Sequence, residues 1–120
     1  MRSFRTVALF WQIRLSKMEN PTLFVVILRY IVPIEIIIEQ RDEHVIFLDK
    51  YYAKGIFHAS GPQIPRYGGM ILAKASSREE LNRILAEDPF SQYKSAEYQV
   101  IEFTINKRSD AFDVFLENSQ

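Results

Sequence analysis

The residues best suited to catalysis in this chain are a histidine and an aspartate that lie far apart in the sequence. His44 falls within an apolar helical stripe, and Asp88 directly precedes Pro89 at a predicted helix end. Imidazole changes its charge near neutral pH, and a carboxylate beside it would fix its tautomer. The pair could therefore perform general acid–base chemistry. The structural alternatives are a core histidine bonded to a backbone carbonyl and an ordinary Asp-Pro turn.

Several side chains could line a pocket around this pair. Arg29 ends the first strand, where it could pair with a substrate carboxylate or be a solvated strand-end charge. Ser60 ends a second strand, and its hydroxyl could reach a ligand, whereas His58 in the same strand is interpreted mainly as structural. The predicted substrate-binding residues are Arg29, Tyr30, Ser60, Gly61, Pro89 and Phe90.

The composition argues against several classes of protein. The chain has 120 residues, which indicates one domain, and its 15 basic residues balance 15 acidic ones, so no basic field would gather a nucleic acid. It has no cysteine, which removes disulfides and thiolate sites and fits the cytoplasm. No apolar run approaches the roughly 20 residues of a membrane span. The sequence shows no metal-ligand spacing and no nucleotide, flavin or haem motif, so we expect no metal and no cofactor.

An N-terminal extension, residues 1–20, precedes the first clean strand pattern. Arginines flank its apolar run over residues 7–11 as in a signal peptide, but Gln12 and Arg14 end the run and no cleavage site follows. Met18 could be the natural start of the protein. The segment before it is then either upstream sequence or an added amphipathic element.

Hydrophobic periodicity predicts four strands. The segment 23–30 is apolar on both alternating faces, which is typical of a strand buried on both sides. Later strands are predicted over 56–61, 70–75 and 96–105. The second and third of the four should pair as a hairpin across a loop rich in glycine and proline.

Two helices are predicted between these strands. The first covers about residues 41–54 and ends at Gly55, after an ambiguous apolar segment over 34–40 that we interpret as an irregular turn. The second begins at Ser77, which forms a capping box with Glu80.

The order β-α-β-β-α-β predicts an α+β, ferredoxin-like domain with a four-stranded antiparallel sheet. One face of that sheet would carry no helix, so we expect a homodimer that buries the open sheet face. The domain should span residues 21–106. In the polar tail, residues 107–120, Phe112, Phe115 and Leu116 could form a small docking turn.

Four stretches of the sequence, read in order, carry a family resemblance. They are Phe24-Val25-Val26-Ile27-Leu28, Arg41-Asp42-Glu43-His44 with Phe47-Leu48, Ser60-Gly61-Pro62, and Glu87-Asp88-Pro89-Phe90. In these the chain resembles the YCII-related family, a branch of the dimeric α/β-barrel superfamily. The family typically has Arg-Pro-x-His where this chain has Asp42 in place of the proline, a departure that should matter little for chemistry.

The resemblance implies a small homodimer in which two open sheets pack face to face and a His–Asp pair lines a pocket. It would make His44 and Asp88 the catalytic residues. Related barrels include muconolactone isomerase-like enzymes and haem-free monooxygenases, and some YCII-like proteins are believed to be lyases acting on aromatic or cyclic substrates. We therefore expect a cofactor-independent enzyme that eliminates or isomerises a small, anionic or cyclic substrate. The alternative is a non-catalytic dimeric module that binds a small ligand.

Overall fold

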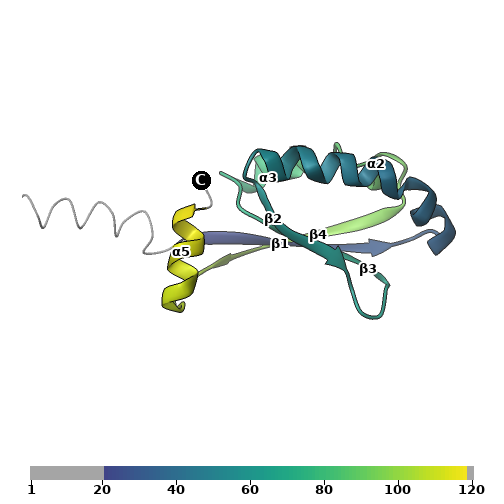
Figure 1. Ribbon diagram of the computed structural model, residues 1–120. Helices are drawn as coiled ribbons and strands as arrows, with labels where there is room; N and C mark the ends of the chain where they lie inside the picture. Colours follow the sequence, from purple (N-terminus) through teal and green to yellow (C-terminus); the bar gives the residue numbers. More distant parts are fainter. Residues whose placement is uncertain (1–20, 119–120) are drawn as a thin grey trace, which may run out of the picture.

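The computed structural model describes residues 21–118, and Figure 1 shows how their elements are arranged. The predicted extension, residues 1–20, lies outside this range. In chain order the elements are β1 (Thr22–Tyr30), α2 (Ile34–Ala53), β2 (Phe57–Pro62), β3 (Gly68–Ala73), α3 (Arg78–Leu85), α4 (Pro89–Gln92), β4 (Ala96–Thr104) and α5 (Asp110–Asn118).

The four strands form one antiparallel sheet in the order β2-β3-β1-β4, with β1 in the centre. Leu28 of β1 lies opposite Gly69 on one side and Tyr98 on the other. Helices α2 and α3 lie on one side of this sheet (Figure 1). The arrangement confirms the predicted α+β, ferredoxin-like fold.

The main core lies between the sheet and the helices above it. Phe24, Val26 and Leu28 of β1 point into this layer, where α2 contributes Ile37 and Tyr51. The Ser77 half of the predicted capping box forms, because the backbone N–H of Glu80 donates to the Ser77 hydroxyl, whereas the Glu80 carboxylate accepts from the N–H of Ser76. Burial of these apolar side chains fixes the face that each element presents to the core.

The opposite face of the sheet is apolar but largely uncovered. Three of its large side chains, Met70, Ile101 and Phe103, are each at least 40% exposed. Only one end of this face is covered within residues 21–118, where Leu116 of α5 packs against Leu23. The predicted docking turn of the tail is therefore a helix.

The first helix begins at Ile34, so the irregular turn expected over residues 34–40 is wrong. Its run of isoleucines has the composition of a strand, because β-branched side chains favour extended backbone. The fold overrides that preference because Ile37 is buried in the core when the segment is helical. Pro33 at the N-cap also favours this start, since its carbonyl accepts from the N–H groups of Ile36 and Ile37.

The loop between β2 and β3 is held closely against β1. A Cβ on Gly68 would lie 1.7 Å from the carbonyl oxygen of Leu28, so only glycine permits this approach. Gln63 adds two hydrogen bonds, from its side-chain amide to the carbonyls of Leu28 and Gly69. The N–H of Tyr30 donates to the carbonyl of Tyr67 at 2.9 Å, which completes the attachment.

Candidate active site

A four-residue helix that sequence patterns did not predict positions Asp88. Helix α4 follows α3 almost at once, with Asp88 at its N-cap and Pro89 in its first turn. Aspartate is a favoured N-cap residue and proline a favoured first helical residue, so the Asp-Pro pair suits a helix start. The Oδ1 atom of Asp88 accepts a hydrogen bond from the N–H of Phe90 at 3.0 Å. The carboxylate is thus held by its own backbone.

His44 reaches this carboxylate from the inner side of α2. Its Nδ1 lies 2.8 Å from Oδ1 of Asp88. The imidazole stacks on the ring of Phe90, with ring centroids 4.1 Å apart and planes inclined by 16°. The Asp88 side chain is fully buried, whereas that of His44 is 14% exposed. The histidine therefore stands between the aspartate and solvent.

A third member of the site, Tyr98, was not predicted from the sequence. Its hydroxyl donates to Oδ2 of Asp88 at 2.5 Å. Burial, and then the charge of Asp88, raises the pKa of Tyr98 far above its ordinary value, so the phenol keeps its proton. Alternation along β4 places Tyr98 and Val100 on one face, but only the pairing of Tyr98 with Leu28 of β1 shows that this face meets the helices.

These contacts fix which imidazole nitrogen carries the proton. Asp88 already accepts hydrogen bonds from the N–H of Phe90 and the hydroxyl of Tyr98, which suits an ionised carboxylate. An ionised carboxylate can only accept, so Nδ1 of His44 must donate. In neutral imidazole the other nitrogen, Nε2, is then unprotonated and can take a proton. The arrangement has the chemistry of a general base with its orienting carboxylate.

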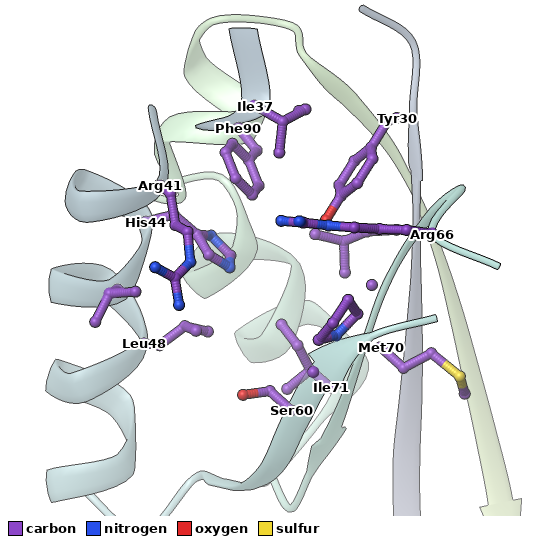
Figure 2. Close-up of a pocket in the computed structure, with 15 residues that line it drawn as sticks. Tyr30, Ile37, Arg41, His44, Leu48, Ser60, Arg66, Met70, Ile71 and Phe90 are labelled. Carbon is purple, nitrogen blue, oxygen red and sulfur yellow. The ribbon is translucent and has the colours of Figure 1, made fainter. Parts of the chain in front are cut away.

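A pocket of about 260 Å³ opens beside His44 (Figure 2). Its walls come from α2, α4, β1 and the β2–β3 hairpin, and most of them are apolar. They are formed by Leu28, Tyr30, Ile37, Arg41, His44, Val45, Leu48, Ser60, Gly61, Pro62, Arg66, Gly69, Met70, Ile71 and Phe90. This volume lies just below the usual range for small-molecule pockets, so the space suits a small ligand.

The structure brings most of the predicted binding residues to this pocket. Tyr30, Gly61 and Phe90 line it, and so does Ser60, whose hydroxyl lies 2.7 Å from that of Tyr52. Pro89 does not line it. That proline is buried in α4, where it starts the helix.

Arg29 lies away from His44. Its guanidinium is 2.5 Å from a carboxylate oxygen of Glu97, and its side chain is 65% exposed. It borders a separate depression that it shares with Arg66 and Tyr67. The pocket beside His44 instead contains two arginines that are not among the predicted binding residues, Arg41 and Arg66. The spacing of Arg41 and His44 on one helix could have indicated that Arg41 lies beside His44. Arg66, in the hairpin loop, had no such signal in the sequence.

The second histidine lies outside the pocket, as expected. His58 packs against Phe115 of α5 with ring centroids 5.4 Å apart. Its Nε2 is buried without a hydrogen-bond partner among the described residues. Burial, together with the charge of Lys74, lowers the pKa of His58, although a backbone hydrogen bond at Gly55 opposes this shift.

Within residues 21–118, no cluster of three or more His, Cys, Asp or Glu side chains could hold a metal ion. The same range has no helix with the length and apolar character needed to cross a bilayer.

The sequence and fold of this chain match one family of small α+β proteins. Residues 23–104 match the YCII-related domain. Because the match covers more than half of the sequence, the chain belongs to the YCII-related family, as the sequence motifs had indicated.

A solved structure with the same fold is 5-chloro-2-hydroxyhydroquinone dehydrochlorinase (TftG) from Burkholderia phenoliruptrix, in complex with 2,5-dihydroxybenzoquinone. The two proteins are 19% identical, and the match covers 73% of this chain and 93% of the other, with a TM-score of 0.55. No curated protein matches the chain.

Proposed function

We propose that this protein is a small enzyme that uses His44 as a general base and acid without a cofactor, and that Asp88 orients the imidazole. The observation that carries the proposal is the hydrogen bond of 2.8 Å between the two side chains, beside a pocket lined by His44. A histidine with only a structural role would more often be sealed from solvent and bonded to backbone. Here the imidazole is partly exposed and its partner is a buried carboxylate.

The proposed reaction begins when Nε2 of His44 removes a proton from the substrate. The electron pair of the broken bond then either expels a leaving group, which is an elimination, or shifts within the substrate and accepts a proton elsewhere, which is an isomerisation. The imidazolium formed is stabilised by the charge of Asp88 and can return the proton to the product or the leaving group. Tyr98 and the N–H of Phe90 hold the carboxylate in place throughout.

Elimination from a ring is the reaction that we favour. The structural neighbour is named a dehydrochlorinase and holds a hydroxylated quinone, which is a small cyclic ligand. The pocket of this chain is small and has largely apolar walls, which suits a ring of that kind. The likeness between the two proteins is one of fold, so the reaction class and the ring substrate are our extension to this chain.

We also propose that two copies associate through the uncovered face of the sheet. That face exposes Met70 on β3 and Ile101 and Phe103 on β4, the two strands that flank β1. An apolar surface of this kind is uncommon on a monomer. A second copy would cover it without any additional segment. The cytoplasmic location expected from the composition stays a prediction.

The function can be tested by measuring chloride release from chlorinated hydroxyhydroquinones, beginning with 5-chloro-2-hydroxyhydroquinone. We expect His44→Asn to lower the turnover rate by about 10²–10⁴-fold, the usual contribution of a general base. His58→Gln is the matched control, because that histidine lies outside the pocket. Equal turnover by the wild type and the His44 variant would contradict the proposal. Tight ligand binding without turnover on any ring tested would favour the non-catalytic binding module.

A further inference from the structure

The side chains found around the pocket that can carry a charge near neutral pH are all basic. Among residues 21–118, two arginines and the active-site histidine line it, and no aspartate or glutamate does. Asp88 lies behind His44 with no exposed surface, so its charge is opposed by the imidazole and does not face the ligand space. The potential in the pocket should therefore be positive.

Both arginines lack a carboxylate partner within residues 21–118. Three other arginines of the chain are paired, since Arg29 contacts Glu97, Arg78 contacts Glu102 and Arg108 contacts Asp113. A single unpaired arginine on a surface is ordinary. Two of them, Arg41 and Arg66, converge on a small apolar pocket that also contains a base.

The two side chains approach from opposite walls. Arg41 lies on α2 three residues before His44, so the two project from neighbouring positions of one helical face. Arg66 belongs to the hairpin loop, and Figure 2 shows it reaching across the pocket toward the helix that carries Arg41 and His44. Because that loop is held by Gly68 and Gln63, the backbone that carries Arg66 has a defined position beside the pocket.

We infer that Arg41 and Arg66 form an anion clamp, so that the substrate is a planar ring bearing an ionised oxygen group such as an enolate, a phenolate or a carboxylate. This inference rests on the proposed function, because it assigns the substrate class of the same site. Guanidinium groups bind such oxygens with paired, charge-assisted hydrogen bonds. The apolar walls formed by Leu48, Ile71 and Phe90 would hold the ring itself.

The same clamp would assist the chemistry. When Nε2 of His44 removes a proton, negative charge develops on the substrate and spreads to its oxygen substituents. Fixed positive groups beside those oxygens stabilise that charge without needing to reorganise. Arg41 and Arg66 would then contribute both to binding and to the rate of proton abstraction.

The experiment compares matched pairs of rings that differ in charge. The probes are 2,5-dihydroxybenzoquinone with its neutral dimethyl ether, and benzoate with benzamide, titrated by calorimetry. We expect the wild type to bind at least one anion about tenfold more tightly than its neutral partner, and Arg41→Gln and Arg66→Gln each to remove about tenfold of that affinity. Neither variant should change the binding of the neutral ring appreciably. Discrimination within the quinone pair would identify the oxygen group as an enolate. Discrimination within the benzoate pair would identify it as a carboxylate.

Two controls separate the clamp from general charge and from catalysis. Arg83→Gln removes an exposed arginine of α3 that does not line the pocket and should change no affinity by more than about twofold. Arg29→Gln tests the arginine expected from the sequence to bind the substrate. Equal binding of charged and neutral rings, an equal loss in the Arg83 variant, or no anion binding at millimolar concentration would overturn the clamp. His44→Asn tests the base separately, since anion preference with unaffected turnover would refute the proposed function and leave the clamp standing.

Discussion

The two histidines of this chain lie in contrasting surroundings on the same sheet. His44 lies between the sheet and α2, bonded to a buried carboxylate and open to a pocket. His58 lies against Phe115 of α5, the helix that covers one end of the other face. Its Nε2 is buried with no partner among the described residues.

This difference shows what a histidine needs in order to act as a base. Burial alone disfavours the charged imidazolium, as the lowered pKa of His58 illustrates. A carboxylate in contact opposes that effect, and access to a cavity gives the free nitrogen something to act on. Only His44 has both. On our proposal, the face of the sheet covered by α2 and α3 carries the chemistry, and the open face is left for association.

The largest expected effect comes from removing the charge of Asp88. In Asp88→Asn the amide oxygen would keep the place of Oδ1, where it accepts from the N–H of Phe90 and from Nδ1 of His44, so the tautomer would be retained but the negative charge that stabilises the imidazolium would be lost. We expect turnover to fall by about 10²–10⁴-fold and the free energy of unfolding to fall by about 1–3 kcal/mol. Nitrogen chemical shifts of the His44 ring would report the tautomer. Full activity of the variant would remove the distinction between the two histidines.

The open face can be tested with charges placed on it. In the double variant Ile101→Glu and Phe103→Glu, two unpaired carboxylates would have to be buried on association, at a cost of several kcal/mol. We expect the dissociation constant of the dimer to rise by about 100-fold or more, measured by analytical ultracentrifugation. Ile46→Glu is the control, because that residue is exposed on the helix-covered side. A wild type that is monomeric at micromolar concentration would refute association through this face.

A smaller effect is expected from Tyr98→Phe, which leaves Oδ2 of Asp88 without its donor. A buried acceptor without a partner costs about 1–2 kcal/mol, which urea denaturation would measure. Turnover should fall by about tenfold, because the carboxylate remains but is held less firmly. Tyr93→Phe serves as the comparison, because it removes an exposed hydrogen bond from a tyrosine hydroxyl to Glu43. Equal effects of the two variants would show that Tyr98 has no special part in the site.

The smallest effect concerns pH and His58. Because burial lowers its pKa in the folded state, the unfolded chain binds the proton more readily. This histidine should therefore reduce stability as the pH falls through about 6.5 toward its lowered value, and should have no effect above that range. Thermal unfolding between pH 8 and pH 5 should show a weaker acid dependence in His58→Gln than in the wild type. An identical pH dependence of the wild type and the variant would show that folding does not lower the pKa of His58.

Much of the fold, and part of the site, followed from sequence patterns. Alternation in β1 and the capping box at Ser77 depend on nearest neighbours, so local rules were sufficient for them. The start of α2 was wrong because burial of Ile37 outweighs the strand preference of its neighbours. Tyr98 and Arg66 were missed because their roles depend on strand pairing and on the path of a hairpin. Neither property has a local signal.

Asp88 has two duties, and this limits how the protein can change over evolutionary time. It caps α4 and it holds His44, so serine or threonine could replace it at the helix start but would not supply the charge. Arg66 has no such second duty within the described residues, and it lies on an exposed loop whose ends are fixed independently. New substrate preferences could therefore arise by substitutions in the hairpin, while the acid–base pair is inherited unchanged.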